Sequence, residues 1–246
     1  MNELDNEEVV AAFENVMASF QDNIGPFSVQ ICEHLRDQYI RLIKNDADDD
    51  DGESILAAVA SFTSIRRVLD AIQEDLNLLS QVEAIIYPCL LHSLTADGLD
   101  SIEEGIDCIT MIVHYGYKTR SISPTIWKLY PQLLYICAGA DGDDEGGFGF
   151  EFVSQIAVTL KNYISRDPEG MLAVGEGQDK NYLHLTYHFL KRCLEVNRNS
   201  GGAYIDGVSI MSLLVAIFEN MQGRIDADIP TLLGFILAEL EFLGSV

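Results

Sequence analysis

Apolar residues recur along most of the chain at intervals of three and four positions, the spacing that gathers them on one face of an α-helix. Strict alternation of apolar and polar residues, which predicts β-strands, is nearly absent. The pattern therefore predicts an all-α protein. A clear example of the helical spacing is the set Ile102, Ile106, Ile109 and Val113.

Residues that commonly start or stop helices divide the sequence into about ten helices. Between two of them, the segment 166–177 (RDPEGMLAVGEG) is polar and rich in glycine, and we expect a short helix within a loop there. The helices are expected at 3–20, 25–44, 54–73, 76–94, 100–116, 123–138, 148–165, 178–195, 203–222 and 227–243.

Single residues fix some of these helix ends. Ser123 followed by Pro124 is the pattern of an N-cap with proline at the first helical position. Asp100 and Asp226 are further N-cap candidates, because a short carboxylate side chain accepts hydrogen bonds from the free N–H groups of a first turn. Gly116 lies where a helix is expected to end.

Helices of similar length with short connectors are typical of helical hairpins stacked in series. HEAT hairpins occupy about 40–47 residues each, so the 246 residues of this chain would form about five. We therefore predict a right-handed α-solenoid of about five HEAT-like helical hairpins. A helical bundle is the alternative, and it is less favoured because so many similar helices exceed what one bundle core usually organises.

The last predicted helix is strongly apolar, with the sequence LLGFILAELEFLGSV. The end of a solenoid needs a polar outer face. We therefore expect either that this helix packs back on the chain or that the chain was cut from a longer polypeptide.

The charge balance is strongly acidic. Lys and Arg number 15 against 39 Asp and Glu, which gives a formal net charge of −24. Nucleic acids and anionic membrane surfaces are polyanions, so we expect neither as a partner. Basic proteins are the expected partners, and their association with this chain should slow as salt screens the charges.

Cysteine usage and the N-terminal sequence indicate a soluble protein of the cytosol or nucleus. The five cysteines are scattered within apolar stretches without a C-x-x-C pair, which predicts buried thiols in a reducing compartment. The acidic start, MNELDNEEVV, is unlike a signal or transit peptide. The longest uncharged apolar stretch, around Val208–Phe218, is much shorter than the ~20 residues that span a bilayer.

Two acidic runs lie between predicted helices. A run of like charges is most often a solvated connector, but the same charge can bind a basic partner, and both interpretations stay open. The connectors of a solenoid line up on one face, which favours a shared binding surface. The candidate cargo-binding residues are Asp46, Asp48, Asp49, Asp50, Asp51 and Glu53 in the first run, and Asp141, Asp143, Asp144 and Glu145 in the second.

Neither run fits the EF-hand calcium loop, which needs oxygen ligands at positions 1, 3 and 5, glycine at 6 and glutamate at 12. With Gly52 at position 6, Ala47 falls at position 1; with Gly146 at position 6, Phe152 falls at position 12. We therefore expect no metal in either run, and a calcium-binding module is only a minor alternative.

No pattern in the sequence supports catalysis. His184 and His188 stand four residues apart, but Leu185 occupies the place of the glutamate in the H-E-x-x-H motif of zinc proteases. No third ligand follows at a suitable spacing, so ordinary helix residues are favoured. The sequence has neither a G-x-S-x-G motif nor a phosphate-binding P-loop. We expect a protein that is not an enzyme and has no cofactor.

Trp127 lies on the predicted helix 123–138 together with Ile126, Leu129 and Leu133. A core residue between neighbouring hairpins is favoured over an exposed binding platform, because a large aromatic side chain contributes most when it is buried. We therefore predict that Trp127 is largely buried.

Five segments, in order along the chain, resemble one known family. They are IGPFSVQICEHL (24–35), VEAIIYPCL (82–90), SISPTIWKLYPQLL (121–134), GFGFEFVSQIAVTLKNYISRDPEGML (147–172) and AIFENMQGRIDADIPTLL (216–233). The third contains a Ser-Pro-x-x-Trp-x-Leu-x-Pro pattern, which is the most specific of the five. The fourth ends in a turn formed by Asn162, Tyr163, Ile164 and Asp167. Together they resemble the importin-beta (karyopherin) superfamily, in the branch of the importin seven and eight receptors.

The resemblance implies that residues 1–246 form a C-terminal HEAT-repeat array of a longer nuclear import receptor. It implies that acidic surfaces hold basic cargo of the ribosomal-protein or histone class. It also implies contacts with Ran-GTP and with Phe-Gly nucleoporins through the parent receptor. Such a protein shuttles between cytoplasm and nucleus through the nuclear envelope.

A HEAT-repeat scaffold or adaptor subunit of a protein complex, with no transport role, is the alternative. The acidic connectors would then be incidental. Binding to a basic ribosomal protein or a linker histone distinguishes the two functions.

Overall fold

A computed structural model describes residues 24–45, 53–139, 147–199 and 207–245. These residues form helices and turns without a named strand, and Val174 and Asn181 make one isolated β-bridge. The all-α prediction is therefore confirmed for this part of the chain. Contacts divide the chain into two compact units, which we call unit 1 (Met1–Lys118) and unit 2 (Thr119–Val246).

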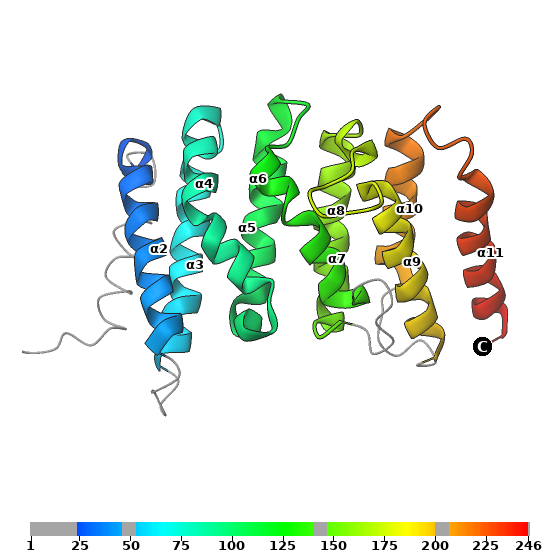
Figure 1. Cartoon of the computed structure of the whole chain (residues 1–246), viewed down its shortest axis with the longest axis horizontal. Coiled ribbons are helices and arrows are strands. Elements are labelled where there is room, and N and C mark those ends of the chain that lie inside the picture. The colour runs from blue at the N-terminus through cyan, green and yellow to red at the C-terminus, as the bar shows by residue number, and fades with distance from the viewer. Residues whose placement is uncertain (1–23, 46–52, 140–146, 200–206, 246) are drawn as a thin grey trace, which may run out of the picture. The chain divides into compact units, whose positions relative to one another are not determined.

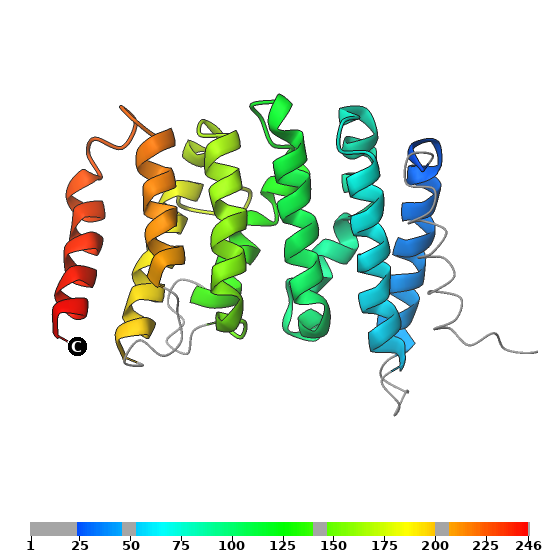
Figure 2. The ribbon, with the colours of Figure 1, turned by 180° about the vertical axis from the view of Figure 1, so that it is seen from behind.

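Unit 1 consists of stacked helical hairpins (Figure 1). Helix α2 packs on α3 within one hairpin, and α4 packs on α5 within the next. Between hairpins, α2 packs on α4 and α3 on α5, and the view from behind shows α3 and α5 side by side (Figure 2). The elements are η2 (Gly25–Phe27), α2 (Ser28–Asn45), α3 (Glu53–Ala71), α4 (Leu76–Ser93), η4 (Ala96–Ser101), α5 (Ile102–Tyr115) and η5 (Gly116–Lys118).

The core of unit 1 follows the helical spacing of apolar residues. On α2, Cys32, Leu35 and Tyr39 are buried at intervals of three and four positions. The ring of Tyr39 meets Phe62 of α3 edge to face, with 5.0 Å between the ring centroids. Burying each large apolar side chain contributes about 1.5–3 kcal/mol. The core on α5 is the set predicted from the sequence, Ile102, Ile106, Ile109 and Val113.

Unit 2 repeats the hairpin arrangement. Helix α7 packs on α8 and α9 on α10 within the hairpins, while α7 packs on α9, α8 on α10 and α11 on α9 between them. The stacked hairpins of both units confirm the predicted α-solenoid arrangement. The elements are α6 (Pro124–Trp127), α7 (Tyr130–Ala138), η6 (Phe150–Phe152), α8 (Val153–Arg166), η7 (Gly170–Leu172), α9 (Tyr182–Asn199), α10 (Gly207–Asn220) and α11 (Ile229–Ser245).

The observed helices agree with the expected ones to within a few residues at most ends, and η7 is the short helix expected within 166–177. The expected helix 3–20 lies outside the described residues. The single helix expected at 123–138 is wrong, because it is divided into α6 and α7. Pro131 has no N–H to donate to the Trp127 carbonyl one turn back, and its ring crowds that carbonyl, so the helix cannot run through.

Two of the predicted N-caps are also wrong. Asp100 lies inside η4, and Ser101 takes the cap position of α5. Asp226 lies in a turn before α11, closed by the hydrogen bonds from the N–H groups of Asp228 and Ile229 to the carbonyl of Ile225. By contrast, Ser123 caps α6 by accepting a hydrogen bond from the Ile126 N–H, as predicted.

All five cysteines are free and buried, as predicted. Burial raises the pKa of the Cys32 and Cys89 thiols to about 12. These thiols are therefore neutral at physiological pH, and a neutral buried thiol is a poor nucleophile.

The apolar stripe of α11 is only partly covered. Leu232 is fully buried, whereas Leu233, Leu237 and Leu240 are exposed. Glu239 is buried at the contact between α11 and α9, with 3.9 Å between its Oε2 and Nε of Arg198. The helix therefore packs back on the chain through a narrow part of its apolar surface.

Candidate functional site

Most of the predicted cargo-binding residues lie outside the described part of the chain. This holds for Asp46, Asp48, Asp49, Asp50 and Asp51, and for Asp141, Asp143, Asp144 and Glu145. Glu53 is the first residue of α3. The structure does describe the helices that carry the two runs: the first run joins α2 to α3, and the second joins α7 to α8. Each run therefore connects the two helices of one hairpin.

Hydrogen bonds close a stem at the base of the second run. The Gly147 N–H donates to the Cys137 carbonyl at 3.1 Å, and the Gly149 N–H donates to the Ile136 carbonyl at 2.9 Å. The Cys137 thiol donates to the Gly149 carbonyl at 3.3 Å. Gly139, just before the run, has a φ of 70°, a conformation that favours glycine. The helix end and the start of η6 thus hold the two ends of this run together.

Gly147→Ala should open this stem. A Cβ at Gly147 would lie 1.8 Å from the carbonyl oxygen of Ile136, so the backbone must shift. We expect the free energy of unfolding to fall by about 1–3 kcal/mol, measured by chemical denaturation. The matched control is Gly234→Ala on α11, where no atom lies within 4 Å of the added Cβ. Equal free energies of unfolding for the two variants would show that the close packing at Gly147 does not stabilise the fold.

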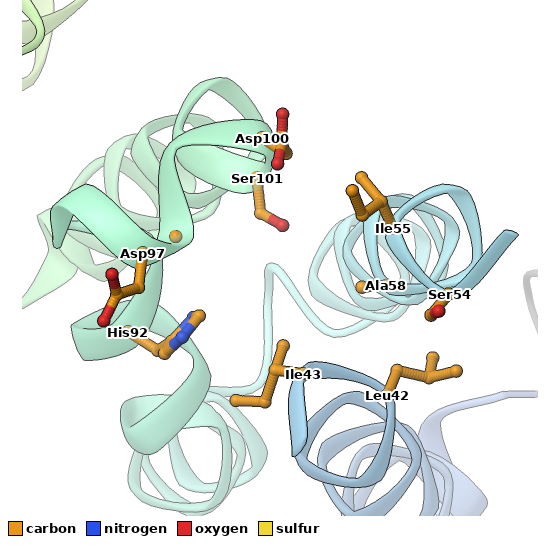
Figure 3. A pocket seen from close by; sticks show the side chains of 10 residues that line it. Leu42, Ile43, Ser54, Ile55, Ala58, His92, Asp97, Asp100 and Ser101 are labelled. Atoms are coloured by element: carbon orange, nitrogen blue, oxygen red, sulfur yellow. The ribbon is translucent and has the colours of Figure 1, made fainter. Parts of the chain in front are cut away.

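A hollow of about 370 Å³ lies at the end of unit 1 from which the first run departs. Its apolar wall is formed by Leu42 and Ile43 from the last turns of α2 and by Ile55 and Ala58 from the first turns of α3. Its other wall comes from the end of α4 and from η4. We call this hollow the η4 pocket (Figure 3).

The polar side of the η4 pocket is formed by His92, Asp97, Asp100 and Ser101. In Figure 3, Ile43, His92 and Ser101 face the hollow, and the carboxylate of Asp97 lies beside His92. Burial lowers the pKa of His92, and the nearby Asp97 carboxylate partly opposes this shift. His92 is therefore neutral at physiological pH, and the charge of the pocket comes from the aspartates.

A buried phenol, Tyr39, holds His92 of the η4 pocket in place. The Tyr39 hydroxyl and Nδ1 of His92 are 2.9 Å apart in a hydrogen bond, and their rings meet edge to face with 5.7 Å between centroids. Burial raises the pKa of Tyr39 to about 12, so its hydroxyl stays protonated. A Cβ at Gly98 would lie 2.1 Å from the His92 carbonyl oxygen. Glycine therefore allows η4 to close directly on the end of α4.

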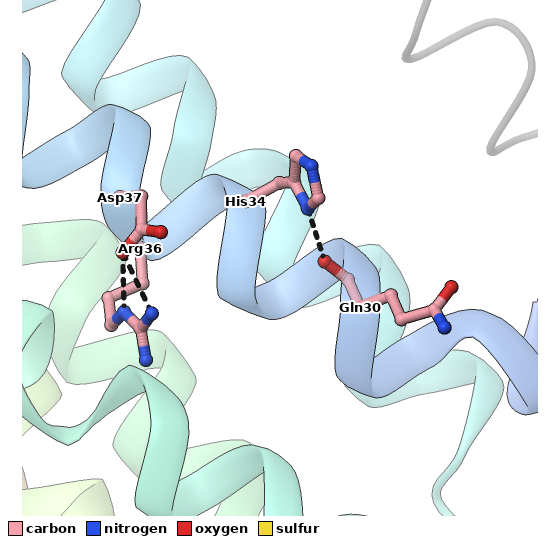
Figure 4. Close-up of polar contacts among 4 residues, drawn as sticks. All are labelled: Gln30, His34, Arg36 and Asp37. Atoms are coloured by element: carbon pink, nitrogen blue, oxygen red, sulfur yellow. Dashed lines mark hydrogen bonds and ion pairs between the residues drawn. The ribbon is translucent and has the colours of Figure 1, made fainter.

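Negative charge is concentrated in unit 1. Residues 1–118 contain 23 of the 39 acidic residues but only 6 of the 15 basic ones. Half of these basic residues already have acidic partners: Arg36 pairs with Asp37 at 2.8 Å (Figure 4), Arg66 with Asp107 at 3.1 Å, and Lys118 with Glu74. A large excess of carboxylates remains without compensating positive charge.

Two of the sequence motifs, the Trp127-containing pattern and the one that ends at Asp167, meet in unit 2. Trp127 is buried, as predicted, and its ring stacks on Tyr182 of α9 with centroids 4.4 Å apart. The Trp127 Nε1–H donates to Asp167 Oδ2 at 3.2 Å, and the Ile122 N–H donates to the same oxygen at 3.0 Å. The Tyr163 hydroxyl donates to the Ile126 carbonyl at 2.8 Å. The Trp-containing helix and the Asn-Tyr-Ile-x-x-Asp turn therefore form one structural unit.

Asp167→Asn should destabilise this junction. Both carboxylate oxygens accept hydrogen bonds, because Gly170 N–H donates to Oδ1 at 2.9 Å while Trp127 and Ile122 donate to Oδ2. An amide in either orientation places its NH₂ group against a donor. We expect a loss of about 1–3 kcal/mol in the free energy of unfolding. The control is Asp179→Asn at an exposed position; a loss of equal size there would contradict the assigned role of Asp167.

His184 and His188 lie on α9, as expected from their spacing. His184 is exposed, and its Nδ1 lies 2.6 Å from Oδ1 of Asn181 just before the helix. The described part of the chain holds no group of three or more His, Cys, Asp or Glu side chains placed to bind a metal ion. Within the same residues, no helix has the length and apolar character needed to cross a membrane.

Stacked helical hairpins, with a buried Trp–Asp junction in unit 2, describe an α-solenoid. Two curated relatives match 92% of this chain: "Probable importin-7 homolog" of Dictyostelium discoideum, 25% identical over 230 residues, and "Importin beta-like SAD2 homolog" of Arabidopsis thaliana, 26% identical over 228 residues. These matches confirm that the motifs resemble those of importins of the importin-beta superfamily.

The chain covers 19% of the first relative and 20% of the second, so it spans about a fifth of their length. No family model matches the sequence. No solved structure matches it either.

Proposed function

We propose that this chain is a C-terminal part of a nuclear import receptor and binds basic protein cargo through its acidic connectors, Asp46–Glu53 and Asp141–Glu145. The observation that carries the proposal is the charge of residues 1–118, where 23 acidic residues stand against 6 basic ones. Such an excess attracts a basic protein from a distance and disfavours an acidic one.

The two relatives support a receptor over a scaffold without a transport role, because both bear the names of importins. Their names are those of transport proteins, which also supports binding rather than catalysis. The fold suits this function, since stacked helical hairpins commonly serve as protein-binding scaffolds.

The partners follow from the same proposal. Cargo would be basic proteins of the ribosomal-protein or histone class. Ran-GTP and Phe-Gly nucleoporins would bind through the longer receptor, which would shuttle between cytoplasm and nucleus. No nucleic acid or membrane partner is proposed, because both would be repelled by the net charge of −24.

The proposal is tested by binding of the 246-residue chain to a linker histone and to a basic ribosomal protein, with an acidic protein of similar size as control. We expect a Kd of about 1 µM or tighter for the basic proteins at low ionic strength and none for the control. Affinity should weaken as salt is added. Absence of binding to both basic proteins at low salt would contradict the proposal and favour the scaffold.

A further inference from the structure

We propose that the η4 pocket holds one arginine side chain of the basic partner. This inference rests on the proposed function and adds a specific contact to it. The acidic connectors attract any cation, whereas a pocket with apolar and charged walls distinguishes one basic side chain from another.

The apolar wall suits the stem of a long basic side chain. Leu42 and Ile43 from α2 and Ile55 and Ala58 from α3 line one side of the hollow. Arginine and lysine bury their methylene groups along apolar surface while the charged head stays near water. The volume of about 370 Å³ lies at the small end of the range for ligand pockets, which suits a single side chain.

The polar wall provides the charge. Asp97 and Asp100 are exposed at the pocket, and no ion pair joins either of them to a basic side chain in the described residues. Both carboxylates are therefore available to an incoming cation. His92 and the protonated Tyr39 are neutral, since burial lowers the pKa of the imidazole and raises that of the phenol, so they do not repel it.

Arginine fits these acceptors better than lysine. The carboxylates of Asp97 and Asp100 lie at separate positions around the hollow (Figure 3). A guanidinium group carries five N–H donors in a planar fork, whereas an ammonium group is a compact and strongly hydrated charge. The guanidinium also loses less hydration on entering a partly apolar site.

The pocket is already formed in the free chain. Tyr39 is fully buried and holds His92 by a hydrogen bond, and Gly98 lets η4 close on the end of α4. Asp97 and Asp100 flank this tight contact on the same short helix. A partner therefore finds the backbone that carries both aspartates already ordered, which favours affinity.

The test compares two peptides of equal charge, a ten-residue lysine peptide and the same peptide with one central arginine. We expect the wild-type chain to bind the arginine peptide about five- to tenfold more tightly. Asp97→Asn with Asp100→Asn should abolish this preference. The control, Glu33→Gln with Glu219→Gln, removes two exposed carboxylates elsewhere and should keep it. Circular dichroism checks that each variant is folded.

The outcomes separate the two proposals. Equal binding of both peptides by the wild-type chain overturns the arginine pocket and leaves the proposed function standing. A preference that survives in the Asp97/Asp100 double variant overturns the pocket as well. Failure of both peptides and of the basic proteins to bind at low ionic strength overturns the proposed function, and the arginine pocket with it.

Discussion

Trp127→Ala should lower the free energy of unfolding by about 3–5 kcal/mol, the cost typical of truncating a buried tryptophan. Trp127 is 8% exposed, stacks on Tyr182 at 4.4 Å and contacts Tyr130 and Tyr163, with ring centroids 5.4 Å and 5.1 Å away. Its Nε1–H also donates to the buried Asp167. The substitution therefore leaves a cavity and removes one partner of a buried carboxylate.

Chemical denaturation followed by far-UV circular dichroism measures this loss, because Trp127 is the one tryptophan of the chain and the variant has no tryptophan fluorescence. Tyr117→Ala is the matched control, since that ring is 62% exposed. An unchanged denaturation midpoint for Trp127→Ala would show that this side chain is not part of the core between hairpins.

Much of the fold could be predicted from local sequence patterns. The burial of Ile102, Ile106, Ile109 and Val113 follows from helical periodicity alone, because a one-sided apolar stripe has to be covered. The cap at Ser123 follows equally directly, since it depends on a hydrogen bond three residues away. Such features depend on neighbours in sequence, and the sequence shows those neighbours.

The incorrect predictions concern places where a contact distant in sequence, or a proline within an apolar pattern, decides the structure. Pro131 is compatible with the first turn of a new helix, and the apolar pattern of residues 123–138 continues across the break, so periodicity alone gave one helix. Asp100 was predicted to be an N-cap because its short carboxylate side chain can accept hydrogen bonds from a first helical turn. It lies instead inside η4, where Gly98 approaches the His92 carbonyl closely. The sequence does not reveal this contact.

The η4 pocket could not have been found from the sequence. Its walls combine residues near 42–58 with residues near 92–101, about 50 positions apart, and no motif links the two groups. The junction of Trp127 with Asp167 is similar, because the residues are 40 positions apart. There, family resemblance drew attention to both motifs but did not indicate that they touch.

Neutralising Asp48, Asp49, Asp50 and Asp51 to Asn should slow association with a basic cargo about tenfold at low ionic strength. These residues lie between α2 and α3 in a run without a basic residue among them. Each exposed pair contributes only about 0.2–1 kcal/mol, so the run acts through its combined field. Folding should be almost unaffected, which circular dichroism and thermal denaturation check.

The control variant must change the net charge equally. Glu33→Gln, Asp179→Asn, Glu219→Gln and Asp226→Asn together remove four exposed carboxylates that lie outside both acidic runs. If position matters more than net charge, this variant should associate faster than the Asp48–Asp51 variant at every low salt concentration.

The proposed capture of basic cargo by the acidic connectors is tested by the association rate with a linker histone across a salt series. We expect the association rate of the wild-type chain to fall steeply with salt. The Asp48–Asp51 variant should associate more slowly and depend less on salt, and the two rates should converge at high salt as the charges are screened. An unchanged association rate and an unchanged salt slope in that variant would contradict the claim and leave the run as a solvated connector.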